Sequence, residues 1–73
     1  NYAYIAENGN GVEIVDISDS SKPSLVSVFK REGINALALA ISADTLYIAS
    51  GKEGIIAVDV SDPKNPREQD HIL

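Results

Sequence analysis

The sequence predicts an all-β fold made of short antiparallel strands. Short runs of β-branched and aromatic residues alternate with turns rich in Asn, Gly, Asp, Ser and Pro, which is typical of strands joined by tight connections. The runs and turns also recur in the same order at a fixed spacing, which is typical of a repeat architecture. We therefore expect seven strands, divided between two copies of one structural unit.

The start of the chain has the pattern of a β-hairpin. Residues 2–6 form a short apolar and aromatic run, and residues 12–17 (VEIVDI) form a β-branched run. Asn-Gly pairs lie between them at residues 8–11, and such pairs favour hairpin turns because Asn and Gly both tolerate positive φ.

A turn and a third strand are expected next. Residues 16–23 (DISDSSKP) combine the residue types that stabilise turns. Pro23 has no N–H to donate to a strand ladder, so it marks the boundary of a strand. Residues 24–29 (SLVSVF) then alternate with the two-residue period of a strand.

The segment at residues 33–44 (GINALALAISAD) is ambiguous. It is rich in Ala and Leu, which favour helices, and some of its apolar residues have helical spacing: Ile34, Leu37, Ala38 and Ile41. The same segment also has a period of two, with large side chains at positions 37, 39 and 41 and alanines at 36, 38 and 40. Because the surrounding segments resemble strands, we expect a strand here, crowded on both faces.

The rest of the chain repeats its first part at an offset of 43 residues. Strands are predicted at residues 45–50, 55–61 and 67–73, with a GKEG turn at residues 51–54. The identities at this offset are Tyr4/Tyr47, Ile5/Ile48, Ala6/Ala49, Gly11/Gly54, Val15/Val58, Asp16/Asp59, Ser18/Ser61, Asp19/Asp62 and Pro23/Pro66.

Such a period is typical of β-propellers, which have four strands in each blade, and of arrays of paired helices. The strand pattern favours a partial propeller of antiparallel four-stranded blades, about one and three-quarter blades in all. We expect residues 1–32 to form strands b, c and d of one blade, and residues 33–73 to form strands a to d of the next. Each blade needs a neighbour on both faces, so the expected partners are further blades from the same chain or from identical copies.

Two segments of the chain resemble the LVIVD-type repeat: residues 4–23 (YIAENGNGVEIVDISDSSKP) and residues 46–66 (LYIASGKEGIIAVDVSDPKNP). The resemblance covers nearly the whole chain and implies a β-propeller of several blades. Ser20 departs from the family pattern, which has proline there as at Pro63, and the departure affects only a turn. The family is mostly bacterial and archaeal and often exported, so the resemblance implies an extracellular, cell-surface or periplasmic location.

Composition excludes several classes of function. The formal charge of −5 opposes binding to nucleic acid or to anionic membranes, and no apolar run is long enough for membrane insertion. The chain has no cysteine and one histidine, and it has no motif for a phosphate or a nucleophile, so we expect no cofactor, metal or catalytic residue. Because the 73 residues begin with Asn1 and include no methionine, we expect a processed product or a segment of a longer chain.

The repeated turns contain clustered oxygen ligands, and two interpretations are open. A calcium loop requires closely spaced carboxylates, but the glycine and the terminal glutamate of such a loop are missing. The alternative is that Asp and Ser side chains bond nearby backbone N–H groups and fix the turn, and we favour this alternative because the pattern recurs. The structural turn residues are then Asp16, Ser18, Asp19, Pro23, Asp59, Ser61, Asp62, Pro63 and Pro66.

Charged and polar loops at one end of the predicted propeller are the candidate binding surface, since binding residues tend to lie on loops of rigid scaffolds. The simpler interpretation of these loops is a solvated rim. The candidates are Glu7, Asn8, Asn10, Lys30, Arg31, Glu32, Lys52 and Glu53. We expect Tyr4 and Tyr47 to pack between blades, and His71 to be a surface residue at an outer edge.

Two functional hypotheses follow. The first is a non-catalytic scaffold or binding module of a larger exported or cell-surface protein, with loops that contact a protein or glycan partner. The second is part of a propeller enzyme whose central-channel active site is built from other blades. The first is favoured because, in these 73 residues, Asn35 is almost the only polar residue expected near such a channel.

Overall fold

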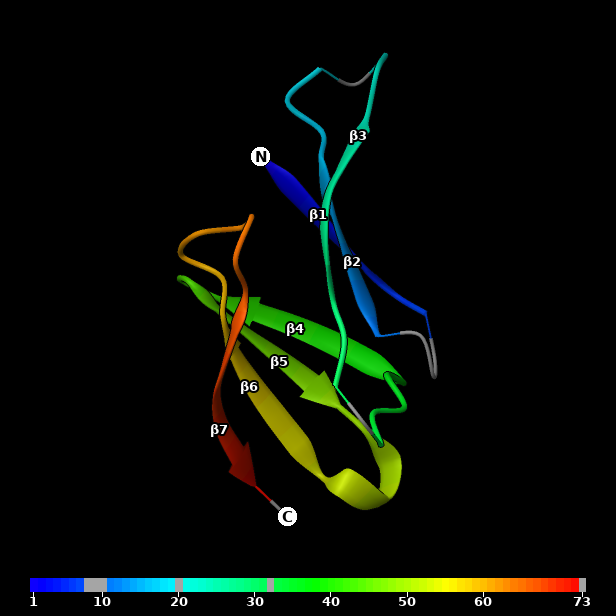
Figure 1. The fold of residues 1–73 in the computed structure, drawn as a ribbon, viewed down its shortest axis with the longest axis vertical. Coiled ribbons are helices and arrows are strands. Elements are labelled where there is room, and N and C mark those ends of the chain that lie inside the picture. Colours follow the sequence, from blue (N-terminus) through cyan, green and yellow to red (C-terminus); the bar gives the residue numbers. More distant parts are fainter. Residues whose placement is uncertain (8–10, 20, 32, 73) are drawn as a thin grey trace.

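The computed structural model describes residues 1–7, 11–19, 21–31 and 33–72. These residues form seven strands, one short 3₁₀ turn and two antiparallel sheets (Figure 1), so the predicted all-β fold class is confirmed. The first sheet has the order β1-β2-β3 and the second has the order β4-β5-β6-β7. The elements are β1 (Tyr2–Ala6), β2 (Val12–Asp16), β3 (Ser24–Phe29), β4 (Ala38–Ser42), β5 (Thr45–Ala49), η1 (Gly51–Glu53), β6 (Ile55–Asp59) and β7 (Arg67–Ile72).

The ambiguous Ala-Leu segment contains a strand rather than a helix. β4 pairs with β5 so that Leu39 lies opposite Ile48 and Ile41 lies opposite Leu46. The two-residue period therefore prevails over the helical spacing, and it directs Leu39 toward the core. The expected crowding on both faces is wrong for the described residues, because Ile41 is 50% exposed and Leu39 is the one residue of β4 that is partly buried. Asn35 precedes this strand, and it is not part of it.

The 43-residue repeat extends to the backbone hydrogen bonds. The Glu7 N–H donates to the Gly11 carbonyl at 2.8 Å, and the corresponding Ser50 N–H donates to the Gly54 carbonyl at 2.8 Å. The register also shifts at equivalent places, between residues 14 and 15 in β2 and between residues 57 and 58 in β6. The two sheets therefore share turns and β-bulges as well as sequence.

The two sheets pack against each other around one hydrophobic core. Its buried side chains come from both sheets and from the segment between them: Val12, Ile14, Phe29, Ile34, Ala36, Leu46, Ile48, Ile56, Val58 and Val60. One polar contact also joins the sheets, because the Ser27 hydroxyl on β3 donates to the Pro63 carbonyl in the turn after β6 at 2.6 Å.

Each sheet has two faces, which we name by their place in the repeat. The forward face includes Val12 in the first sheet and its counterpart Ile55 in the second. The backward face includes Ile48 in the second sheet and its counterpart Ile5 in the first. Val12 and Ile48 are both 0% exposed and belong to the shared core, so the forward face of the first sheet packs on the backward face of the second.

The other two faces are open in the described residues. Ile55 and Ile5, the counterparts of the two buried residues, are each 42% exposed. Tyr4 packs against the core, whereas its counterpart Tyr47 is 40% exposed. Burial thus distinguishes repeat positions that are identical or similar in sequence.

Candidate functional site

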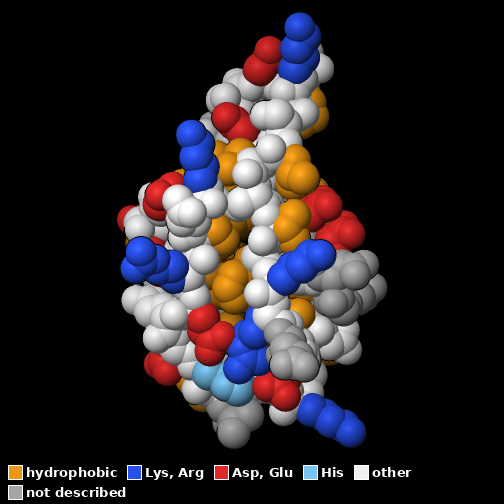
Figure 2. All heavy atoms as spheres, viewed as in Figure 1, with side chains coloured by type: hydrophobic (Ala, Val, Ile, Leu, Met, Phe, Trp, Pro, Cys, Tyr) orange, Lys and Arg blue, Asp and Glu red, His pale blue; other side chains and the backbone are white. Residues whose placement is uncertain are grey.

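A cluster of charged side chains lies where the segment after β3 meets η1 and β7. The guanidinium of Arg31 contacts two carboxylates: its Nε donates to Glu68 Oε1 at 2.5 Å, and an Nη donates to Glu53 Oε1 at 3.3 Å. All three side chains are only partly exposed. In Figure 2 the pale blue histidine lies among red and blue side chains in this lower part of the molecule.

His71 completes the cluster through both ring nitrogens. Its Nδ1 lies 3.3 Å from an Nη of Arg31, and its Nε2 lies 2.5 Å from the Glu53 carbonyl oxygen and 3.7 Å from Glu53 Oε1. An arginine can only donate and a carbonyl can only accept, so a neutral imidazole with its proton on Nε2 satisfies both contacts.

A β-bulge explains why two residues three apart on β7 share this cluster. Glu68 lies opposite Val58, and His71 lies opposite Ile56, with the register shift between them. A regular strand would direct residues at this spacing to opposite faces. The extra residue in the bulge brings both side chains to the face that Arg31 approaches.

The electrostatics of the cluster hold the segment after β3 in place. The hydrogen bond that Arg31 donates to Glu68 raises the pKa of the guanidinium, and the bond that it donates to Glu53 raises this pKa further. The two glutamates offset the charge of the arginine. The arrangement therefore fixes the connection between the two sheets on the outer strand of the second sheet.

A hollow of about 400 Å³ adjoins the cluster. It is lined by Gly33, Asn35, Ser50, Gly51, Lys52 and Glu53. The Asn35 N–H donates to the Ser50 hydroxyl at 2.9 Å, and Ser50 is 1% exposed, so this buried hydroxyl has a partner. Asn35 is itself exposed and can present its amide side chain to a polar group in the hollow.

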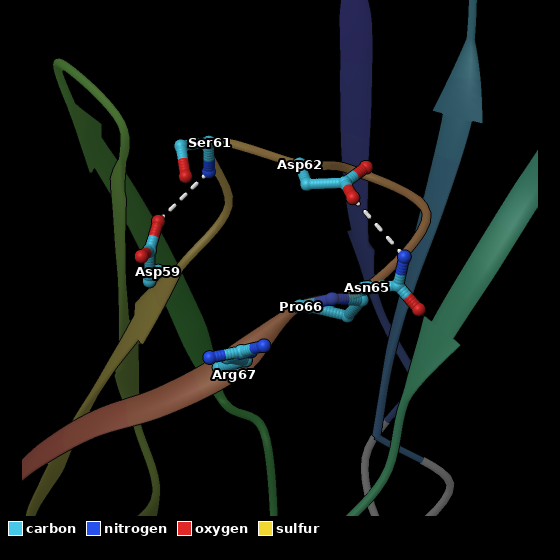
Figure 3. A pocket seen from close by; sticks show the side chains of 6 residues that line it. All are labelled: Asp59, Ser61, Asp62, Asn65, Pro66 and Arg67. Carbon is cyan, nitrogen blue, oxygen red and sulfur yellow. Dashed lines mark hydrogen bonds between the residues drawn. The ribbon is translucent and has the colours of Figure 1, made fainter.

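A second hollow, of about 530 Å³, lies at the turn between β6 and β7 (Figure 3). It is lined by Asp59, Ser61, Asp62, Asn65, Pro66 and Arg67. Asp59 accepts a hydrogen bond from the Ser61 N–H at 2.9 Å, and Asp62 accepts bonds from the Lys64 N–H at 3.2 Å and the Asn65 side-chain amide at 3.0 Å. These bonds lower the pKa of both carboxyl groups.

The first copy of the turn repeats the backbone contacts but differs in the side chains that bond its second aspartate. Asp16 accepts hydrogen bonds from the N–H and hydroxyl of Ser18 at 2.8 and 2.7 Å, and Asp19 accepts them from the N–H and hydroxyl of Ser21 at 3.1 and 2.8 Å. The bonds from Ser18 lower the pKa of Asp16. One oxygen of each of these carboxylates is therefore directed at its own turn. Within the described residues, no three His, Cys, Asp or Glu side chains are grouped closely enough to hold a metal ion.

The structure brings together some of the predicted loop residues. Arg31 and Glu53 are in contact, which places the segment after β3 beside the turn between β5 and β6. Lys30 and Lys52 are exposed, and Glu7 directly follows β1 of the first sheet. Three predicted candidates lie outside the described residues: Asn8, Asn10 and Glu32.

Two members of the cluster were missed by the sequence reasoning. Glu68 had no predicted role, and His71, expected at the surface of an outer strand, is instead only partly exposed against Arg31. His71 does lie on the outer strand β7. The repeat gives no signal for the pair, because the residues that correspond to Glu68 and His71 in the first copy are Leu25 and Val28.

The repeat in sequence and in backbone hydrogen bonding agrees with a comparison against known families. The LVIVD repeat model matches residues 1–30 and 35–72. The chain belongs to the LVIVD repeat family. No curated protein and no solved structure matches this LVIVD repeat chain. In the part of the chain that the structure describes, no helix has the length and apolar character needed to cross a bilayer.

Proposed function

We propose that this LVIVD repeat chain is a non-catalytic scaffold or binding module within a larger, exported or cell-surface β-propeller. The observation that carries the proposal is that one face of each sheet is exposed: the backward face of the first sheet and the forward face of the second. The matching face of the other sheet is buried between the two sheets in each case. A repeat unit of this kind is stable only when neighbours cover both of its faces. Its partners are then further blades, from the same chain or from identical copies.

The exposure of matched residues supports this proposal. Val12 is 0% exposed where it meets the second sheet, and its counterpart Ile55 is 42% exposed. Leaving a few hundred Å² of such apolar surface in water costs several kcal/mol at about 25 cal/mol per Å². That cost is comparable to the whole stability of a small domain, so the open faces require an occupant.

The packing is also directional. A forward face meets a backward face, so stacking of further units is head-to-tail and uses two different surfaces. Ile55 on the forward face and Ile5 on the backward face mark the two free ends of the described stack. Head-to-tail stacking that closes on itself gives a ring, which is the architecture of a propeller.

Such a scaffold leaves the loops at its rim available for recognition. The exposed Lys30 and Lys52 flank the cluster around Arg31, and the hollow beside it offers the exposed Asn35. Loops fixed on a rigid sheet are suited to contact a protein or glycan partner.

The directional stacking is tested with two variants that each block one end. Ile5→Glu blocks the backward face and Ile55→Glu blocks the forward face, and both side chains are exposed enough to be replaced without unfolding the sheet. We expect the unmodified chain to form assemblies larger than a dimer in sedimentation velocity experiments. Each variant alone should remain a monomer, because all of its copies lack one of the two complementary faces.

The decisive sample is the mixture. Each variant keeps the face that the other has lost, so an equimolar mixture should form a one-to-one dimer and no larger species. Lys64→Glu, in an exposed turn, is the matched control and should assemble like the unmodified chain. A folded, monomeric unmodified chain at millimolar concentration would overturn the proposal.

A further inference from the structure

The hollow beside the charged cluster differs from the open faces because it is built within one repeat unit. Its lining comes from two connections of the second sheet, the segment before β4 and the turn between β5 and β6 (Figure 1). We propose that this hollow binds a neutral sugar unit with neighbouring hydroxyl groups, such as a hexopyranose of a glycan. The inference rests on the proposed function as a binding module, and it names the class of ligand.

The residues that line the hollow are not explained by the repeat. Their counterparts at the offset of 43 residues are of different types: Glu7 for Ser50, Gly9 for Lys52 and Asn10 for Glu53. A residue that the shared architecture needs should recur at this offset, as the turn aspartates do. The lining therefore indicates a role that belongs to the second unit alone.

Hydrogen bonds hold the walls of the hollow in place. The Asn35 N–H donates to the Ser50 hydroxyl at 2.9 Å, and the Ser50 N–H donates to the Gly54 carbonyl at 2.8 Å. The Glu53 N–H donates to the Ser50 carbonyl at 2.9 Å. Groups that are already fixed lose little conformational entropy when a ligand binds, so the site is pre-organised.

Burial alternates along the segment before β4 and directs two side chains to the same side. Ile34 and Ala36 are buried in the core, whereas Asn35 and Leu37 are exposed, Leu37 at 59%. Residues two apart in an extended segment share a side, so the amide of Asn35 and the apolar side chain of Leu37 lie together. A Cβ added to Gly51, which lines the hollow, would be 3.7 Å from Leu37 Cδ1. Leu37 therefore forms an apolar edge of the hollow.

Three other side chains give the hollow donors and an acceptor. Among the described residues, the hydroxyl proton of Ser50 has no acceptor, although Ser50 is 1% exposed and lines the hollow. Lys52 adds an ammonium group, which only donates. The contacts of the charged cluster engage Glu53 Oε1, whereas Oε2 lies 3.8 Å from the position of a Cβ on Gly33 and can accept. Donors and an acceptor are thus side by side.

The charges around the hollow cancel, which favours a neutral ligand. Arg31 and Lys52 are positive, and Glu53 and Glu68 are negative. An anion or a cation would leave one charge uncompensated, whereas a hydroxyl group can donate and accept at the same time. The C–H groups of a sugar ring can pack against Leu37. The volume of about 400 Å³ lies within the range of small-molecule sites.

The test measures binding of three neutral sugars, the methyl glycosides of glucose, galactose and mannose, to the unmodified chain. Saturation-transfer NMR detects the bound sugar, and titration in the millimolar range gives the dissociation constant. We expect at least one of the three to bind. Glucuronate and glucosamine, which carry a charge on a similar ring, should bind several-fold more weakly.

Two substitutions locate the bound sugar. Asn35→Ala removes the exposed amide but keeps the backbone N–H that bonds Ser50, so the midpoint of thermal unfolding should not change. Lys52→Met removes the ammonium group and keeps an unbranched side chain. Each should raise the dissociation constant by about three- to tenfold, because the sugar loses one hydrogen bond. Lys64→Met, in the exposed turn between β6 and β7, is the matched control and should bind like the unmodified chain.

The inference is wrong if none of the three neutral sugars binds, or if a charged sugar binds as tightly as the best neutral one. It is also wrong if Asn35→Ala and Lys52→Met both bind like the unmodified chain, since the sugar would then contact another surface. The sedimentation experiments test the stacking of copies separately. A chain that assembles as expected but binds no sugar would retain the scaffold and leave its loops to a protein partner.

Discussion

Two alanine substitutions at equivalent repeat positions measure how much the packing between the sheets contributes to the free energy of unfolding. Ile48 and Ile5 have the same residue type, the same strand position and the same place in the repeat. They differ in coverage, since Ile48 is 0% exposed against the first sheet and Ile5 is 42% exposed on the open face. Ile48→Ala and Ile5→Ala therefore form a matched pair.

The expected magnitudes follow from this difference. Ile48→Ala removes about three buried methylene-sized groups at about 0.8 kcal/mol each and leaves a cavity, so we expect a loss of about 3–4 kcal/mol in the free energy of unfolding. Ile5→Ala leaves no closed cavity because solvent fills the space, and the group was only partly buried, so we expect a loss of about 1 kcal/mol.

Urea unfolding followed by far-UV circular dichroism measures both losses in the same buffer. The experiment is done in the Ile55→Glu background, so that assembly of copies does not cover Ile5. Equal losses from Ile48→Ala and Ile5→Ala would refute the packing of the two sheets, because they would mean that Ile48 is not covered by the first sheet.

Three further outcomes are expected. Gly11 has φ +92° and an added Cβ would collide with the Phe29 carbonyl oxygen, so Gly11→Ala should lower the free energy of unfolding by on the order of 3 kcal/mol, measured by urea titration. Hydrogen bonds from Ser18 lower the pKa of Asp16, so the ionised carboxylate stabilises the fold at pH values above the unfolded-state pKa of about 3.9. This stabilisation is lost as the pH falls through the lower pKa of the folded state. In Asp16→Asn, the free energy of unfolding should therefore decrease less between about pH 5 and pH 2 than in the unmodified chain. Arg31→Ala should speed amide exchange in β7 by a few-fold, because ion pairs near the surface contribute about 0.2–1 kcal/mol each, and unchanged exchange would mean that the cluster does not hold that strand.

The strands were predictable because their local pattern and their repeat agree. The apolar run before the Asn-Gly pairs is β1, and the SLVSVF segment is β3. The Ala-Leu segment could be assigned only from the strand-like segments around it, because its own pattern fits both a helix and a strand. Its strand begins at Ala38, later than the pattern suggests, because a strand can extend only where a partner strand runs beside it.

The charged cluster was less predictable because it depends on a β-bulge. The distance along the chain between Glu68 and His71 indicates opposite faces of a regular strand, and only the register shift in β7 brings them to one face. The contact of Arg31 with both residues joins positions 37 and 40 residues apart, and no periodicity in the sequence reports a contact of that range.

The hydroxyl that joins the two sheets has no equivalent in the second repeat. Ser27 donates a hydrogen bond to the Pro63 carbonyl, whereas its counterpart in the second sheet is Asp70, which accepts a hydrogen bond from the His71 N–H at 2.8 Å. The second sheet therefore does not repeat the donor that joins the first sheet to it. In the sequence, the counterpart of Pro63 in the first repeat is a serine at position 20, which brings both a hydroxyl and a backbone N–H. The joint between the two described sheets is thus specific to them, because its donor and its acceptor lie at positions where the two repeats differ in sequence.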